Sequence, residues 1–348
     1  MPLAQKHELV SDSQPAQRRG NAKAVWTLLL LAPFVAEVLS GATRLSFIFV
    51  FIPEVMVWGT GALLAREIVR RWRAGWPSLL MLGLALSVWE EFLCQQTSLA
   101  PLPWAGASVT YARLWGVNWL YFLFMLAYES IWVVMVPVQL TELFFPARRE
   151  LPWLRTRGIV IASGVFAWGS FMAWFAWVQR ARPKLLHVPA YNPPAITLLV
   201  GVLAIAVLIV EAWLIGRREI RVQTRSAPSP LAVGIIALLF GLPWYGIMAL
   251  VFSPGPHPPF WIPMIAGVLW AGFAYAVFRR FTSWSGWTDA HRCAACFAAT
   301  IVCMAGGFLG SGSWLRIDLI GKCVFNAIAV LGFALLMRSI RARERSAS

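Results

Sequence analysis

Three carboxylates in the first half of the chain stand in otherwise apolar surroundings. Glu90 and Glu91 are adjacent near the end of an apolar run that begins at Trp76, and Glu129 lies inside the next apolar run. Gln95 follows Glu91 by four residues and therefore shares its face of a helix. Carboxylates in such surroundings can act as general bases, or they can bind protons or hard cations. Glu90, Glu91, Gln95 and Glu129 are therefore the candidate catalytic residues.

Further polar residues are expected close to these carboxylates. Glu37 and Glu54 lie in the two preceding apolar runs, Asn118 is about three helical turns from Glu129 on the same face, and Tyr128 is its sequence neighbour. If the N-terminus lies inside the cell, the carboxylates share one polar layer in the outer half of a membrane. A carboxylate inside a membrane costs several kcal/mol unless it is protonated or paired. The layer is therefore expected to be functional or to be tied into a hydrogen-bonded network.

The composition identifies a membrane protein. The 348 residues are 59% hydrophobic and only 13% charged, and the mean hydropathy is +0.68. These values exclude an ordinary soluble domain. The net charge of +15 does not indicate nucleic-acid binding, because the arginines fall in short clusters between apolar runs and form no basic face. The expected partner is the lipid bilayer, and no nucleic-acid partner is expected.

The apolar runs are long enough to cross a bilayer as helices. They predict an all-α, polytopic transmembrane bundle of about ten helices. The predicted spans are Ala24–Ser40, Leu45–Ala65, Trp76–Gln95, Val117–Phe145, Gly158–Val178, Ala195–Ile215, Leu231–Phe252, Pro259–Phe278, Cys293–Leu309 and Leu319–Met337.

The charges between the spans predict the topology. A cluster of arginines follows every second span, beginning respectively at Arg66, Arg148, Arg217, Arg279 and Arg338. The positive-inside rule then places these loops and both termini in the cytoplasm. Arginine greatly outnumbers lysine, as is typical of GC-rich bacterial genomes. The expected location is therefore the bacterial cytoplasmic (inner) membrane, with multiple passes.

The predicted spans form one domain between two tails. Residues 1–23 are polar and are expected to be a disordered cytoplasmic tail, residues 24–338 form the transmembrane domain, and residues 339–348 form a second cytoplasmic tail. Within the domain, residues 24–145 carry the acidic site and residues 158–338 act as a scaffold. The only carboxylate inside the later spans is Glu211, close to the predicted cytoplasmic end of the sixth.

Two short stretches resemble a known family of membrane enzymes. The segment Ser87–Gln95 reads Ser-Val-Trp-Glu-Glu-Phe-Leu-Cys-Gln, which is similar to the Glu-Glu-x-x-x-Arg motif of the CPBP intramembrane proteases (CAAX proteases and bacteriocin-processing enzymes). The segment Phe124–Tyr128 is similar to that family's Phe-x-x-x-His motif. The resemblance covers about a fifth of the chain. It implies that glutamates and histidines activate a water molecule for peptide cleavage.

The sequence departs from the family's pattern at decisive positions. Gln95 replaces the arginine, and Tyr128 or Glu129 stands where the histidine would be. All four histidines of the chain fall outside the first four spans: His7, His187, His257 and His291. The resemblance therefore implies a diverged CPBP-like protein whose chemistry has been lost or changed.

Other interpretations of the acidic layer stay open. The chain could be a proton- or cation-coupled transporter, or a non-catalytic membrane assembly or lipid-binding protein. No metal site is predicted, because a site made only of carboxylates and Gln95 suits a hard cation and not zinc, and the cofactor, if any, is unknown. Glu67 and Glu142, near Arg66 and the pair Arg148–Arg149, are expected to form interfacial salt bridges.

The cysteines of the ninth predicted span favour packing over chemistry. Cys293 and Cys296 form a C-x-x-C pattern, with Cys303 seven residues further along the same span. Such a pattern can hold a metal or a disulfide. A structural zinc site requires four ligands, and the predicted location faces the reducing cytoplasm. Small side chains packed within a helix are therefore the preferred interpretation.

Overall fold

The computed structural model describes residues 21–100, 111–185, 187, 190–218, 223–252, 256–309 and 311–347. Within this part of the chain, nine helices are long and apolar enough to cross a membrane. The predicted all-α, multi-pass class is thereby confirmed. Residues 1–20 of the predicted tail lie outside the described residues, whereas residues 21–23 form the first turn of a helix.

The first four spans are each divided by a change in helix type. The first span, Asn21–Val38, ends in the π-helix η1 (Phe34–Val38). The second comprises η2 (Leu45–Val50), α2 (Phe51–Glu54), η3 (Val55–Gly59) and α3 (Thr60–Arg71). The third comprises α4 (Trp76–Trp89) and η4 (Glu90–Cys94), and the fourth comprises α5 (Trp119–Tyr128), η5 (Glu129–Met135) and α6 (Val136–Phe144).

The later spans are more regular. They comprise α7 (Thr156–Trp174) with η7 (Phe175–Ala181) and α8 (Arg182–Leu185), α9 (Ala195–Gly216), α10 (Pro230–Phe252), α11 (Trp261–Ser283) and α13 (Arg316–Ala347). A further helix, α12 (Asp289–Gly306), is 18 residues long and begins with the polar residues Asp289, His291 and Arg292. The predicted tail that starts at residue 339 continues the α13 helix to Ala347.

Short elements connect the spans. They are η6 (Pro146–Arg148), η8 (Ser311–Ser313), the antiparallel pair β1 (Arg113–Leu114) and β2 (Val117–Asn118), and the parallel pair β3 (Gln223–Ser226) and β4 (Trp284–Ser285).

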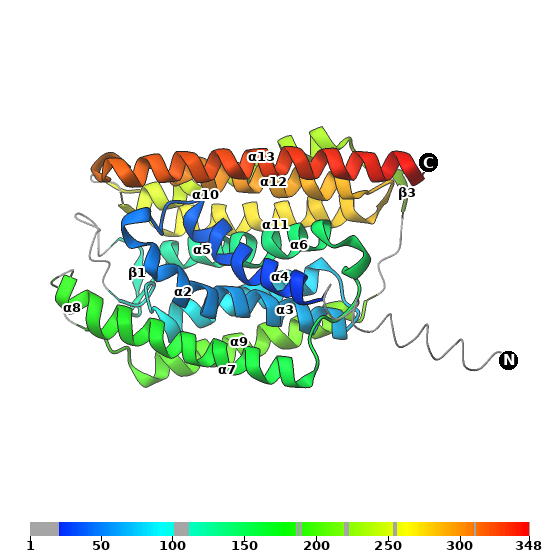
Figure 1. Cartoon of the computed structure of the whole chain (residues 1–348). Helices are drawn as coiled ribbons and strands as arrows, with labels where there is room; N and C mark the ends of the chain where they lie inside the picture. Colours follow the sequence, from blue (N-terminus) through cyan, green and yellow to red (C-terminus); the bar gives the residue numbers. More distant parts are fainter. Residues whose placement is uncertain are drawn as a thin grey trace.

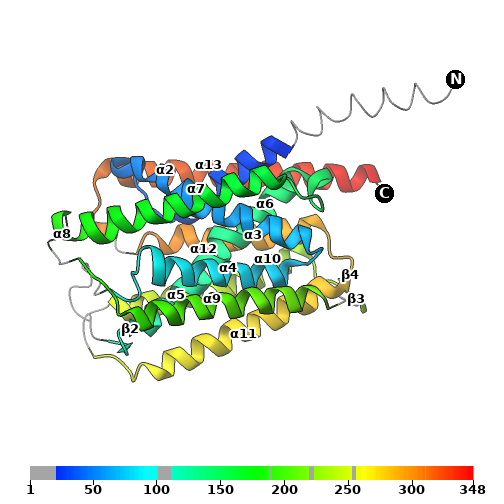
Figure 2. The ribbon, with the colours of Figure 1, turned by 90° about the horizontal axis from the view of Figure 1, so that it is seen from below.

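The spans that carry the central carboxylates form the middle of the bundle. In Figure 1, α13 and α12 run along one side, α7 and α9 along the opposite side, and α4, α5 and α6 between them; Figure 2 shows α9 and α11 together at the edge of the turned view. In the most apolar part of Trp76–Cys94, 72% of the residues are buried, and in that of Trp119–Phe144 the share is 61%. The corresponding shares are 11% for α9 and 6% for α11. The third and fourth spans therefore supply the interior, and the later helices present apolar side chains outward.

The loops after every second span meet at one end of the bundle. Arg148, after α6, donates to Asn21 at the start of the first span across 3.0 Å. Arg343, near the end of α13, donates to the carbonyl of Leu143 in α6 across 3.3 Å. The described ends of the first and last spans therefore lie at the same end of the bundle, as the predicted alternation requires.

A buried ion network holds this end together. Glu142 is fully buried and pairs with Arg66 (3.2 Å), Arg70 (2.6 Å) and Arg292 (3.5 Å). Glu67 pairs with Arg66 across 3.1 Å. The expected salt bridges of Glu67 and Glu142 are confirmed. Their partners come mainly from α3, because helix α3 lies beside α6 and presents its arginines one turn apart.

Candidate functional site

All five intramembrane glutamates of the acidic layer lie in or directly beside π-helical segments, and Glu91 follows Glu90 within η4. Glu37 is within η1, Glu90 begins η4 and Glu129 begins η5, while η3 begins directly after Glu54. The wider hydrogen bonding is visible at the end of η4, where the amide of Gln95 donates to the carbonyl of Glu90 across 2.9 Å. A π-helical turn inside an α-helix is rare and is often found at functional sites. Four of the five π-helical segments in the described residues lie at the acids, and the fifth, η7, carries no acid.

Glu129 is the most isolated of these carboxylates. It is 1% exposed, and neither of its carboxylate oxygens has a hydrogen-bond partner among the described residues. The charged groups that act on it electrostatically are Glu90, Glu91 and Glu37. An unpaired carboxylate in an apolar interior is far more stable with a proton than without one. Glu129 therefore has the surroundings of a proton carrier.

Glu90 lies beside Glu129 and shares its surroundings. It is 2% exposed, and its Oε2 atom also has no partner among the described residues. Gly83, on α4, packs against the backbone of Ser130 at the start of η5, so the two spans approach closely at this level. Glu90 and Glu129 therefore lie within electrostatic range of each other across the third and fourth spans.

Glu91 has different surroundings from its neighbour in the sequence. Its carboxylate accepts hydrogen bonds from the Thr97 hydroxyl (2.8 Å), the Ser98 amide (2.7 Å) and the Ser98 hydroxyl (2.5 Å). Three donors satisfy most of the acceptor capacity of a carboxylate. Glu91 therefore fixes the turn that follows η4, whereas the Oε2 atom of Glu90 has no partner among the described residues and the neighbour of its carboxylate is the Cys94 thiol.

The remaining predicted neighbours have mainly structural contacts. Asn118 caps α5 by accepting from the Tyr121 amide across 3.0 Å. The Tyr128 hydroxyl donates to the carbonyl of Ala36, which joins the fourth span to the first. Gln95 is half-buried, and its side chain makes no hydrogen bond with the described residues. The structure thus brings Glu90, Glu91 and Glu129 together without linking Gln95 to them.

Glu37 and Glu54 extend the acidic layer toward the first two spans. Glu54 is buried and accepts a hydrogen bond from the Thr43 hydroxyl, while its Oε2 atom has no partner in the described part of the chain. Glu37 is partly exposed and acts electrostatically on Glu54, Glu90 and Glu129. Glu37 therefore connects the two parts of the layer.

Several residues near the acids were not predicted from the sequence. Thr97 and Ser98 follow the third span, where hydroxyl residues commonly form turns, and their spacing from Glu91 could have suggested a capping role. Tyr245 on α10 and Cys303 on α12 lie within electrostatic range of Glu37. Nothing in the apolar pattern of α10 or α12 distinguishes these two residues from their neighbours.

The described residues contain no arrangement suited to a metal ion. No three histidine, cysteine, aspartate or glutamate side chains among them converge at metal-ligand positions. Cys293, Cys296 and Cys303 are free and buried in α12. His291 caps the start of that helix and lies 2.7 Å from the carbonyl of Pro228, and His257 stacks on Tyr111. Carboxyl groups such as those of Glu90 and Glu129 can bind and release protons inside a membrane.

Comparison of the chain with protein-family models, with curated proteins and with solved structures gives no match. The interpretation of the site therefore depends on its own geometry.

Proposed function

We propose that this chain is a proton-coupled membrane transporter in which Glu129 and Glu90 bind and release the coupling proton. The observation that carries the proposal is the set of buried carboxylate oxygens without a hydrogen-bond partner in the described residues: both oxygens of Glu129 and the Oε2 atom of Glu90. A hydrogen-bonded structural network would satisfy these oxygens, as the turn at Thr97 and Ser98 satisfies Glu91. Intramembrane acids that face the interior of a bundle are typical of proton pathways.

The π-helical segments support the same function. The segments η3 and η5 interrupt their spans, and η1 and η4 end theirs, each close to at least one of the acids. Interrupted helices at mid-membrane level are the elements from which many transporters build their sites. A π-helical turn can also convert to an α-helical turn and rotate the residues on one side of it. Such a rotation would move Glu90 relative to Glu129 and alter its access to water.

The orientation of the protein is part of the proposal. The basic loops after the second, fourth, sixth and eighth spans, together with the end of α13, would face the cytoplasm of a bacterium, with both termini inside and the chain in the inner membrane. With α12 as a tenth crossing, the number of spans is even, as two internal termini require. Glu90 and Glu129 would then lie in the outer half of the membrane.

A diverged CPBP-like hydrolase is the second candidate. It is favoured by the adjacent pair Glu90–Glu91 at the end of the third span, beside Glu129 of the fourth. In this case Glu90 would act as the general base toward a water molecule. The absence of a described histidine beside the acids, and the engagement of Glu91 by Thr97 and Ser98, favour transport over hydrolysis.

The transport proposal is tested with the purified chain in proteoliposomes that contain a pH-sensitive dye. Amines, amino acids, sugars and inorganic cations are added in turn, and internal acidification is followed. We expect one class of solute to move protons with the wild-type protein, and we expect Glu129→Gln to reduce that rate at least tenfold. Glu211→Gln is the matched control, because Glu211 is exposed on α9, and it should transport as the wild type does.

Two results would contradict the proposal. One is the absence of solute-dependent proton movement for every class with the wild-type protein. The other is equal rates for wild type and Glu129→Gln. Cleavage of membrane-embedded peptides that is lost in Glu90→Gln would instead support the hydrolase.

A further inference from the structure

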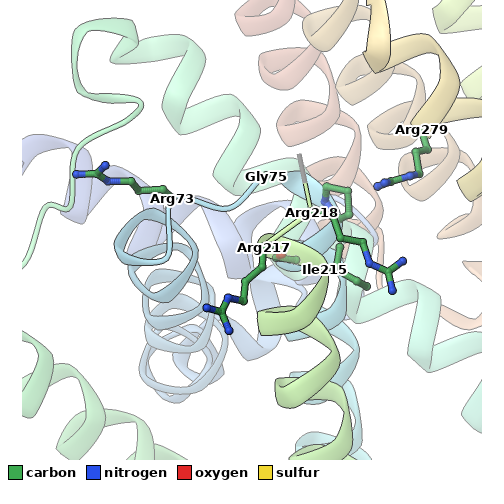
Figure 3. A pocket seen from close by; sticks show the side chains of 9 residues that line it. Arg73, Gly75, Ile215, Arg217, Arg218 and Arg279 are labelled. Carbon is green, nitrogen blue, oxygen red and sulfur yellow. The ribbon is translucent and has the colours of Figure 1, made fainter. Parts of the chain in front are cut away.

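A pocket of about 270 Å³ opens at the end of the bundle where the basic loops meet. It is formed where α3 ends, α4 begins, α9 ends and α11 approaches its last turn. Figure 3 shows four arginine side chains around it. The lining residues are Arg73, Gly75, Pro77, Ser78, Ile215, Gly216, Arg217, Arg218 and Arg279.

The charged side chains among the described residues that line this pocket are all arginines. None of its lining residues is an aspartate or a glutamate, and among the described residues none of its four arginines forms an ion pair with a carboxylate. The contrast with Arg66 and Arg70 is sharp, because those arginines share Glu142 one to two turns earlier on α3. The part of the chain that the structure describes therefore gives these four arginines no carboxylate partner, in contrast to the neighbouring network.

The arrangement of the guanidinium groups indicates the size of the ligand. In Figure 3 the side chain of Arg279 points toward Arg218, with Arg217 nearby, whereas the side chain of Arg73 points away from these three. Arg279 is half-buried, whereas Arg73, Arg217 and Arg218 are exposed. A single small anion would reach only part of this set. A ligand with two separated phosphate groups would meet more of it, because guanidinium groups bind phosphate through paired hydrogen bonds.

The backbone adds to the positive potential. Helix α4 begins at the pocket with Gly75 as its N-cap and Pro77 in its first turn. The first-turn amides of a helix carry a partial positive charge. The Ser78 hydroxyl, in the same turn, donates to the carbonyl of Ala212 across 2.7 Å.

The apolar surface beside the pocket indicates where the ligand comes from. Trp213 and Leu214, in the last turn of α9, are 41% and 47% exposed. In a membrane these side chains would face acyl chains, with the arginines at the level of the headgroups. Basic pockets between the ends of membrane helices are suited to anionic lipid headgroups.

We propose that this pocket binds the phosphate groups of an anionic phospholipid, with the acyl chains lying along α9. A lipid with two phosphates fills the spread of arginines better than a lipid with one. Free phosphate offers the same chemistry without the acyl chains, and the experiment separates the two sources. The proposal does not depend on the function of Glu90 or Glu129.

The test is lipid binding by the full chain in phosphatidylcholine nanodiscs. Fluorescent cardiolipin, with two phosphates, and fluorescent phosphatidylglycerol, with one, are the probes, and inorganic phosphate and pyrophosphate are the competitors. We expect cardiolipin to bind at least tenfold more tightly than phosphatidylglycerol. The double variant Arg218→Gln/Arg279→Gln should weaken cardiolipin binding at least tenfold. Arg280→Gln is the matched control, because Arg280 is the exposed neighbour of Arg279 and does not line the pocket.

The outcomes are distinguishable. Equal binding of cardiolipin by wild type and the double variant would overturn the site. Retention of the melting temperature in the double variant excludes a loss of fold as the cause of weaker binding. Competition by millimolar phosphate at the affinity of the lipid itself would assign the pocket to free phosphate and overturn the lipid. No effect of phosphate, together with loss of cardiolipin binding in the double variant, supports the lipid.

Discussion

Replacement of Arg66 by alanine should be among the most destabilising changes at the basic end of the bundle. The Arg66 side chain is fully buried. It donates to Glu142 across 3.2 Å and to Glu67 across 3.1 Å, and its guanidinium lies 3.4 Å from the centre of the Trp153 ring. Its remaining donors reach the carbonyls of three residues in the loop after α6: Arg148 (3.1 Å), Arg149 (2.8 Å) and Leu151 (2.8 Å).

The magnitude follows from what each partner retains. Loss of one member of a buried ion pair costs about 3–5 kcal/mol, because the other charge stays buried. Glu142 would keep Arg70 and Arg292, and Glu67 would keep the amide of Trp153 across 2.7 Å. These remaining contacts place the cost near the lower end, at about 3 kcal/mol, and the three loop carbonyls lose their donors in addition.

The assay is reversible unfolding in mixed detergent micelles, followed by tryptophan fluorescence. Hydrogen exchange of residues 146–155 reports the loop directly, and its protection should fall in Arg66→Ala. Arg71→Ala is the matched control, because the Arg71 side chain is 41% exposed and lies 4.0 Å from Glu67; a long ion pair with one solvent-exposed member is expected to contribute about 0–1 kcal/mol. A cost below about 1 kcal/mol for Arg66→Ala, or equal costs for the two variants, would refute the reasoning.

Two further predictions concern the surroundings of the acids. A methyl group at Gly83 would lie 3.0 Å from the Cα atom of Ser130, so Gly83→Ala should cost about 1–3 kcal/mol in the same unfolding assay. Gly272 has open space around it, so the control Gly272→Ala should cost less than about 1 kcal/mol. Equal costs for the two variants would contradict the close packing of α4 against η5. Ser98→Ala removes one donor to Glu91, so it should cost about 1–3 kcal/mol, and unchanged stability would show that the turn after η4 does not depend on this hydroxyl.

The sequence predicted the spans closely because their limits have local causes. Trp76–Gln95 was predicted and Trp76–Cys94 is observed; Ala195–Ile215 was predicted and Ala195–Gly216 is observed. Pro77 and Pro194 favour helix starts at these positions, and arginines end the apolar run after Gly216. Hydropathy locates these two helices within one residue at each end, but the last span was predicted as Leu319–Met337 and the helix extends to Ala347, because the charged residues after Met337 continue it.

The interior of the site was less predictable because it depends on contacts between spans. The sequence placed Glu90 and Glu91 in one pair, but Thr97 and Ser98 bind only Glu91, because the chain turns back directly after η4. The π-helical segments have no periodicity that a hydropathy pattern records. Gln95, predicted to share the face of Glu91, lies beyond this change of helix type.

Ten spans were predicted, and nine helices in the described part of the chain are long and apolar enough to cross a membrane. The difference is α12, which is not among the nine. This helix packs along α10 and α13 in the bundle, but its first turn holds Asp289 and Arg292, which pair with Arg149 and Glu142 across 2.5 and 3.5 Å. These charges reduce its apolar length. Its polar start is part of the ion network, so its composition reflects protein contacts more than contact with lipid.

The central claim is that Glu129 carries an exchangeable proton inside the membrane. Difference infrared spectroscopy of the purified protein, recorded between acidic and alkaline pH, measures this proton through the carbonyl stretch of the protonated carboxyl group. We expect the wild type to show a carbonyl band that shifts in deuterium oxide. This band should be lost in Glu129→Gln and should persist in Glu211→Gln. An unchanged band in Glu129→Gln would contradict the assignment of the exchangeable proton to Glu129.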